Sequence, residues 1–235
     1  MTEPIVVRVP TLIEVLGKPL GRQRLVNWRE VARHLPVRED LELRSVAHAP
    51  NVAAPLDQGG LGACTGFATG GCASTAPYPY QLTAAECVRL YKRATQLDPF
   101  PGTYPPVDTG SSGWAAMTAA FEVGYFDGFA MTAGLTAVLQ ALQTRPVILG
   151  LDWYSTFDDT DPDGRIRLTS SCQLRGGHEI KADEVDVENG RVWVRNSWGL
   201  WGVEHRGLWG YGYLTFRDLA LLLESGGDAC APELP

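Results

Sequence analysis

Three side chains in this sequence could together cleave an amide bond: the thiol of Cys64, the imidazole of His178 and the amide of Asn196. A thiol attacks a carbonyl carbon only as the thiolate, so it needs a base to take its proton. An imidazole can do so if a third group holds the ring in the right tautomer. An asparagine oxygen can accept from one ring N–H and leave the other nitrogen facing the sulfur.

The surroundings of Cys64 suit a working thiol. Cys64 follows a glycine-rich run, residues 59–63, and opens a segment in which small residues recur at helical spacing. The macrodipole and the free N–H groups at a helix N-terminus favour a thiolate. Residues 58–85 contain no charged side chain, so no carboxylate there opposes ionisation. Cys72 and Cys87, by contrast, fit the usual buried, inert state of a cysteine.

His178 and Asn196 lie in the strand-forming half of the chain. His178 follows Gly176-Gly177, where the backbone is open to close approach, although a lone histidine there is more often structural. Residues 180–194 predict paired strands around an Asn-Gly turn. A two-residue turn would pair His178 with residue 201, so we expect a bulge or a longer loop centred near Val187.

Taken in order, these residues resemble a known family. Gln58-x5-Cys64 with Phe67, Gly177-His178 and Asn196-Ser197-Trp198-Gly199 are similar to the pattern of the papain-like cysteine peptidases, above all the short bacterial and bacteriophage members. The resemblance covers roughly residues 40–217. It implies that Cys64 is the nucleophile and His178 the base, with Asn196 orienting His178.

The resemblance also implies the binding groups. Gln58 would form the oxyanion hole together with the backbone N–H of Cys64, and Trp198 would cover the contact between His178 and Asn196. Substrate main chain would add as a strand along a short strip. The implied substrate-binding residues are Gly110, Ser111, Ser112, Gly113, Gly177 and Trp198.

Several features of the chain depart from the family pattern. Leu61 stands where many secreted relatives have a disulfide cysteine, which agrees with a reducing compartment. Thr65 replaces the aromatic residue that often follows the nucleophile. About fifty residues precede the Gln58 segment, which is too few for the long inhibitory propeptide of the secreted enzymes, so we expect none.

The elements predicted around these residues indicate an α+β fold with two lobes. We expect helices over residues 26–35 and 64–75, one capped by Thr83 and Glu86, one starting at Ser111 or Ser112, and one ending at Pro146. Strands are expected over residues 147–151, 180–194 and 208–216. One papain-like domain, residues 1–235, would combine a mainly helical lobe, 58–128, with a mainly β lobe, 1–57 and 129–235. The β lobe would be an antiparallel sheet or barrel-like, with the cleft between the lobes.

Composition limits the other function classes. The chain has 235 residues, a net charge of −7 and five cysteines without a C-x-x-C pair. These values disfavour nucleic-acid binding, a zinc site and a redox dithiol. Asp159-x-Asp161-x-Asp163-Gly164 matches the start of a calcium loop, but Ser170 stands at the position of its last ligand. We interpret it as a solvated turn and expect no metal and no cofactor.

No stretch is typical of a membrane span, and the first apolar run, residues 5–7, is too short for a signal peptide. We therefore expect a monomer in the cytoplasm of a bacterial or phage-infected cell, with a phage particle as another location. The leading function is a cysteine peptidase acting on peptides or proteins through an acyl-enzyme. An amidase or acyltransferase on a peptidoglycan-type amide, and a catalytically silent peptide-binding module, remain open.

Overall fold

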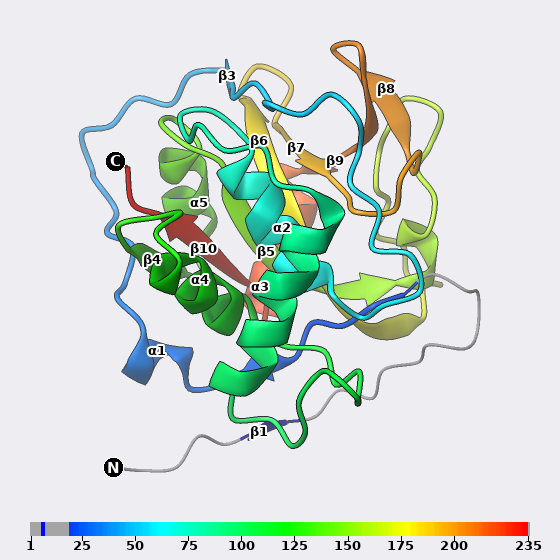
Figure 1. Ribbon diagram of the computed structural model, residues 1–235. Coiled ribbons are helices and arrows are strands. Elements are labelled where there is room, and N and C mark those ends of the chain that lie inside the picture. Colours follow the sequence, from blue (N-terminus) through cyan, green and yellow to red (C-terminus); the bar gives the residue numbers. More distant parts are fainter. Residues whose placement is uncertain (1–5, 8–18, 235) are drawn as a thin grey trace.

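The computed structural model describes residues 6–7 and 19–234 (Figure 1). Ile5, in the apolar run judged too short for a signal peptide, lies outside the described residues. The helices are α1 (Trp28–Val31), α2 (Cys64–Ala73), α3 (Ala84–Leu97), α4 (Gly113–Glu122), α5 (Leu135–Ala141) and α6 (Phe216–Glu224), with a short 3-10 turn, η1 (Ser155–Phe157). The strands are β1 (Val6–Val7), β2 (Arg24–Leu25), β3 (Val46–Ala47), β4 (Phe129–Thr132), β5 (Val147–Tyr154), β6 (Leu174–Asp186), β7 (Arg191–Arg195), β8 (Val203–His205), β9 (Leu208–Thr215) and β10 (Asp228–Pro232).

Local signals place the helix ends close to where the sequence predicts them. The capping box of α3 is formed: Thr83 accepts from the N–H of Glu86, whose carboxylate accepts from the N–H of Thr83. Ser112 caps α4 by accepting from the N–H of Ala115 at 3.2 Å. The helix predicted over residues 26–35 shortens to one turn, α1.

One antiparallel sheet runs through the molecule. Its strand order is β4-β10-β5-β6-β7-β9-β8, and β3 pairs with β6 beside that path. The sheet is open, so the barrel-like form considered from the sequence is wrong. A separate two-stranded ribbon joins β1 to β2. The central strand β6 carries His178, which places it in the middle of the sheet.

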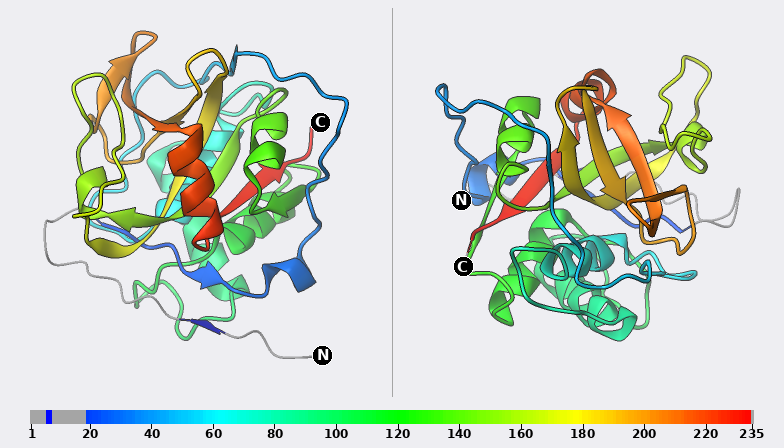
Figure 2. Two further views of the ribbon diagram at one scale, coloured as in Figure 1. Left: turned by 180° about the vertical axis from the view of Figure 1, so that it is seen from behind. Right: turned by 90° about the horizontal axis from the view of Figure 1, so that it is seen from above.

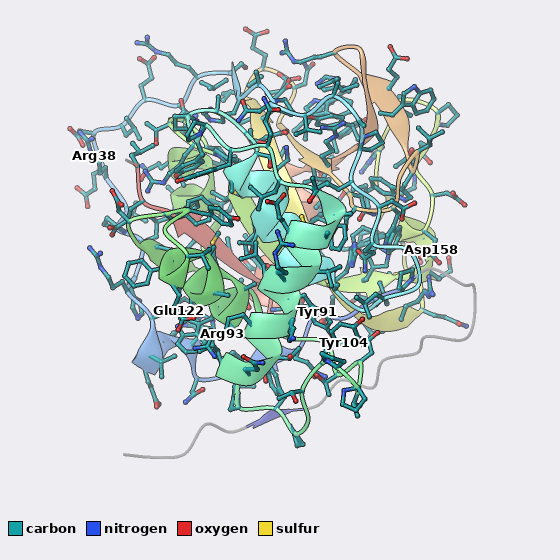
Figure 3. The ribbon with its side chains drawn as sticks, in the orientation of Figure 1. Arg38, Tyr91, Arg93, Tyr104, Glu122 and Asp158 are labelled. Carbon is teal, nitrogen blue, oxygen red and sulfur yellow. The ribbon has the colours of Figure 1, made fainter. Side chains whose placement is uncertain are left out.

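The two parts of the fold have separate cores. Seen from above, α2, α3 and α4 form a layer on one side of the sheet (Figure 2). One core lies in the helical layer, around Phe67, Tyr91 and Met117. The other is formed by the sheet with α5 and α6, around Leu149, Trp153 and Leu214. At the outer surface of the helical layer, Arg93 of α3 holds Glu122 of α4 in a two-pronged ion pair at 2.6 and 2.9 Å (Figure 3).

The hairpin of β6 and β7 has the irregularity that the sequence requires. Asp186 pairs with Arg191, so residues 187–190 form a longer loop than a two-residue turn. The register then shifts between Ala182 and Glu184, which is a bulge at Asp183. Beyond the bulge, Lys181 pairs with Arg195. Together the loop and the bulge move Asn196 toward His178, as predicted.

All five cysteines are free: Cys64, Cys72, Cys87 and Cys230 are buried, and Cys172 is partly exposed. No disulfide therefore joins any two of them. Within residues 6–7 and 19–234, no helix has the length and apolar character needed to cross a membrane.

Candidate active site

Cys64 is the first residue of α2, so its N–H has no acceptor within the helix. Its side chain is fully buried. Small residues let α2 pack tightly on α3: a Cβ at Gly66 would lie 2.4 Å from the carbonyl oxygen of Cys87. This close packing explains why a glycine-rich sequence, a poor helix former in isolation, holds a helix here.

A polar network fixes the loop before Cys64. Asp108 accepts from the N–H of Gly62 at 2.7 Å and from the hydroxyl of Tyr91. The same hydroxyl accepts from the N–H of Gly110 at 2.9 Å. Tyr91 lies on α3 beside Tyr104 of the following loop (Figure 3). No motif in the sequence marks Tyr91 or Asp108, yet both tie the loop before Cys64 to the predicted substrate strip.

His178 and Asn196 are in direct contact, with 2.8 Å between Nε2 and Oδ1. The Asn196 Oδ1 also accepts from the backbone N–H of Ser197 at 2.8 Å, so this atom is the acceptor. Nε2 of His178 must therefore carry the proton, and Nδ1 carries a lone pair. Nδ1 is buried and has no hydrogen-bond partner among the described residues. A neutral imidazole with one nitrogen fixed and the other free has the form of a base.

Two tryptophans enclose the His178 ring. The Trp198 ring lies over it at a centroid distance of 4.6 Å with the planes tilted by 31°. Trp153 meets its edge, also at 4.6 Å. The rings of Trp153 and Trp198 thus form an apolar cover around the His178 ring.

Burial dominates the electrostatics of both Cys64 and His178. It lowers the pKa of His178 to about 4, against a smaller opposite effect of the Asn196 hydrogen bond. It raises the pKa of Cys64 to about 12, and the charge of Glu179 acts in the same direction. Backbone N–H groups of Glu179 and Thr65 lower that pKa by a smaller amount. Both groups are therefore neutral at pH 7 in this state of the protein.

The sulfur of Cys64 lies against the N–H of Glu179, the residue next to His178 on β6. In the part of the chain that the structure describes, no hydrogen bond joins the thiol to the His178 ring. Helix α2 and strand β6 pack against each other. The structure thus brings Cys64 to the strand that carries His178, and it joins His178 to Asn196.

Gln58 is fixed in a definite orientation. Its Nε2 donates to the carbonyl oxygen of Leu61 at 2.8 Å, and its Oε1 accepts from the hydroxyl of Ser197 at 2.6 Å. The carbonyl oxygen of Pro19 lies 3.5 Å from Nε2 and accepts from the Trp198 indole N–H at 3.1 Å. The Gln58 amide therefore faces a chain segment that lies over the site. The Ser197 hydroxyl, which no sequence motif marks for this task, sets the orientation of the Gln58 amide.

That segment, residues 19–23, is called the cleft segment below. Its main chain bonds to both sides of the site: Arg22 N–H donates to Gly177 at 3.0 Å, and Gln23 N–H donates to Ser111 at 2.6 Å. Ser111 N–H donates in turn to Gly21 at 2.8 Å. A Cβ at Gly177 would lie 2.4 Å from the carbonyl oxygen of Arg22, so close approach requires a glycine. The few residues of the cleft segment therefore suffice to cover this strip.

The predicted strip residues have different tasks. Ser111 offers its main chain to the cleft segment, whereas Gly110 binds the Tyr91 hydroxyl through its N–H. Ser112 is the cap of α4. Gly113 begins α4, and a Cβ there would lie 2.7 Å from a carboxylate oxygen of Glu179.

The acidic turn that resembles a calcium loop uses its carboxylates within the protein. Asp161 pairs with Arg167, and Asp163 accepts from the Tyr213 hydroxyl at 2.6 Å. No cluster of three or more histidine, cysteine or acidic side chains among the described residues is placed to hold a metal.

Comparison with known proteins identifies the architecture. No family model and no curated protein matches the chain. Xylellain, a cysteine protease from Xylella fastidiosa, is similar over 94% of this chain and 100% of its own, with a TM-score of 0.67 and 14% identity. Procathepsin B from Trypanosoma congolense is similar over 92% and 87%, with a TM-score of 0.66 and 13% identity.

Bromelain from Ananas comosus, solved in complex with the inhibitor E64, is similar over 79% of this chain and 95% of its own. The TM-score is 0.52 and the identity 15%. The chain has the papain-like fold. In that fold the sequence places a thiol at the start of α2 and an imidazole on β6, and the structure brings these elements together.

Proposed function

We propose that the protein is a cysteine peptidase that hydrolyses peptide bonds through a thioester at Cys64. The observation that carries this proposal is the state of His178. Its Nε2–H is bound by Asn196, and its Nδ1 is buried without a partner among the described residues. A buried polar atom without a partner is uncommon and asks for an explanation, which a proton-accepting role provides. The papain-like fold supports the same function.

The mechanism follows from these atoms. The Cys64 thiol gives its proton to Nδ1 of His178, and the sulfur attacks the carbonyl carbon of the substrate. The Gln58 Nε2–H and the Cys64 N–H hold the negative oxygen that forms. The C–N bond then breaks, and the leaving amine takes the proton from His178. Water, deprotonated by His178, attacks the thioester, the C–S bond breaks, and the acid leaves with Cys64 restored.

The test is Cys64→Ala against Cys72→Ala, a matched buried cysteine on the same helix. Hydrolysis of a fluorescently labelled protein is measured for both, in the full chain and in a full chain that also carries Arg22→Ala. The second background is needed because the cleft segment lies over the site. Loss of hydrolysis only with Cys64→Ala supports the proposal. Equal hydrolysis by both variants would overturn it.

The same assay separates the alternatives. Cleavage or amine exchange of a peptidoglycan-type amide, without cleavage of proteins, would indicate the amidase or acyltransferase. Substrate binding without turnover in any background, together with no reaction of Cys64 with E64, would indicate a silent binding module. We also propose kinship with the short bacterial and bacteriophage members, a cytoplasmic location and a monomeric state. The motifs around Cys64 support the kinship, the five free cysteines agree with a reducing compartment, and light scattering tests the monomer.

A further inference from the structure

The side chain of Arg22 enters a buried acidic space beside the proposed nucleophile. Its Nη2 donates to Asp228 Oδ2 at 2.5 Å, and its Nε lies 3.9 Å from Glu179 Oε2. Arg22 is 2% exposed, Glu179 0% and Asp228 4%. The space bounded by Glu179, Asp228 and Gly150 is called the acidic chamber below. It lies next to the site because Glu179 directly follows His178 and its N–H touches the Cys64 sulfur.

The acidic chamber is shaped for a long side chain with a flat cationic end. A Cβ at Gly150 would lie 2.3 Å from Arg22 Nε, so the absence of a side chain there makes the room. Both carboxylate oxygens of Glu179 and Oδ1 of Asp228 lack hydrogen-bond partners among the described residues. A guanidinium has five N–H donors and can serve several such acceptors at once. The walls therefore offer more acceptor capacity than Arg22 uses.

Two buried carboxyl groups, those of Glu179 and Asp228, face the one guanidinium of Arg22. Burial and the charge of Asp228 raise the pKa of Glu179 and favour its protonated form, while Arg22 opposes this, so Asp228 is the main anion that Arg22 neutralises. Buried charges left without a counter-charge are strongly unfavourable. When the cleft segment leaves, the chamber must therefore protonate, fill with water or take another cation. A substrate that brings a cationic side chain meets a chamber already formed.

The direction of the cleft segment shows where that side chain would sit in a substrate. The segment runs parallel to Ser111, with Pro19 on the Trp198 side and Arg22 opposite Ser111. The leaving amine must receive its proton from His178, which Trp198 covers, so the leaving half of a substrate extends toward Trp198. A substrate therefore runs opposite to the cleft segment. The substrate residue opposite Ser111 takes the place of Arg22, and the next substrate residue takes the place of Gly21. The scissile bond follows that next residue, so the residue in the place of Arg22 is the second one before the scissile bond.

We propose that the acidic chamber is a substrate pocket for arginine at the second residue before the scissile bond, and that Arg22 occupies it in place of substrate. This inference rests on the proposed peptidase function. It also explains why the cleft segment persists beside a nucleophile: its reversed direction turns its peptide bonds away from the productive orientation.

The test compares two acyl-dipeptide coumarin amides, Arg-Gly and citrulline-Gly, which differ only in the charge and one donor group of the second residue. The enzyme is the full chain with Arg22→Ala. We expect kcat/KM to be about ten- to a hundredfold lower for the citrulline amide than for the arginine amide, because a hydrogen bond to a charged group typically contributes that much. Adding Asp228→Asn to the same chain should reduce the ratio of the two kcat/KM values, arginine over citrulline, to near one. This ratio does not depend on which fraction of a variant is folded.

Asp163→Asn is the matched control, because Asp163 binds the Tyr213 hydroxyl outside the chamber; it should leave the ratio unchanged. Equal kcat/KM values for both amides in the Arg22→Ala chain would contradict the proposed arginine pocket but not the proposed peptidase activity. Binding of the same two amides to the full chain with Cys64→Ala and Arg22→Ala, measured by calorimetry, tests the chamber without turnover. A preference for arginine there supports the chamber even if no hydrolysis occurs, and equal binding overturns it.

Discussion

Asn196 Oδ1 receives two hydrogen bonds, one from the His178 ring and one from the Ser197 backbone, each at 2.8 Å. The second bond fixes the identity of the atom as oxygen, and the first then fixes the tautomer of the ring. His178 is thus held with Nε2 protonated and Nδ1 free to accept. The geometry of one amide decides which nitrogen of His178 can act as a base.

Replacing Asn196 should therefore impair the proposed reaction without unfolding the protein. In Asn196→Ala the ring loses the acceptor that selects its tautomer, and we expect kcat to fall by about 10²-fold, the low end of what acid–base catalysis contributes. Hydrolysis of the Arg-Gly amide measures this. Asn189→Ala, at the exposed turn where Asn189 binds Asp186, is the control and should keep full activity. An Asn196→Ala enzyme as active as this control would contradict the orienting role.

The cleft segment should limit access to Cys64, and Arg22 should be its anchor. Removing one partner of a buried ion pair costs about 3–5 kcal/mol, so Arg22→Ala should weaken the docking of the segment. We expect Cys64 to react faster with E64 and the Arg-Gly amide to be cleaved faster than in the unchanged chain. Arg33→Ala removes only the exposed pair with Glu233 and should change neither rate. A slower reaction of Cys64 in Arg22→Ala would show that the segment assists the site.

The residues that could be identified from the sequence are those that lie in short sequence motifs. Cys64 follows a glycine run at a helix start, and the capping box that marks the start of α3 is visible in four residues. The spacing between His178, the Asn-Gly turn and Asn196 predicted a longer loop or a bulge in the hairpin, and the structure has both. The bulge falls at Asp183, and its position depends on tertiary contacts, because Asp183 pairs with Lys181 and accepts from the Tyr211 hydroxyl.

No short sequence motif indicates the acidic chamber. Arg22 and Asp228 are 206 positions apart, and neither stands in a motif. Their contact exists because β10 lies between β4 and β5, which brings the C-terminal strand beside the middle of the sheet. The sequence pattern points to the groups of the proposed reaction but not to Arg22 and Asp228, since only the order of the strands brings these two together.

The titration of His178 should report whether the cleft is covered. Burial lowers its pKa to about 4 in this state, below the value near 6.5 of an unfolded chain. Between these values the unfolded chain binds a proton that the folded chain does not, so the His178 contribution to stability is lost as pH falls from about 6.5 toward 4. Imidazole NMR should show a neutral ring at about pH 5 in the unchanged chain. A higher pKa is expected in Arg22→Ala, where water reaches the site.

The contribution of His178 to the pH dependence of stability can be separated from that of other groups with His178→Gln, because glutamine does not titrate. Its stability should fall less on acidification from about pH 6.5 to 4 than that of the parent, as measured by urea unfolding. A parallel decline in both proteins would mean that the ring is already solvated and charged in the folded state.

The packing of α2 on α3 gives the sharpest test of the fold around Cys64, because one helix contains a tightly packed and a loosely packed glycine. At Gly66 a Cβ would lie 2.4 Å from backbone at Cys87, whereas at Gly71 the nearest atom is a flexible part of the Lys181 side chain at 3.6 Å. Gly66→Ala should therefore lower the unfolding free energy by about 1–3 kcal/mol through overpacking. Gly71→Ala should raise it by about 0.5–1 kcal/mol through helix propensity. Urea unfolding of both variants measures the pair, and a stabilising Gly66→Ala would contradict the close approach that places Cys64.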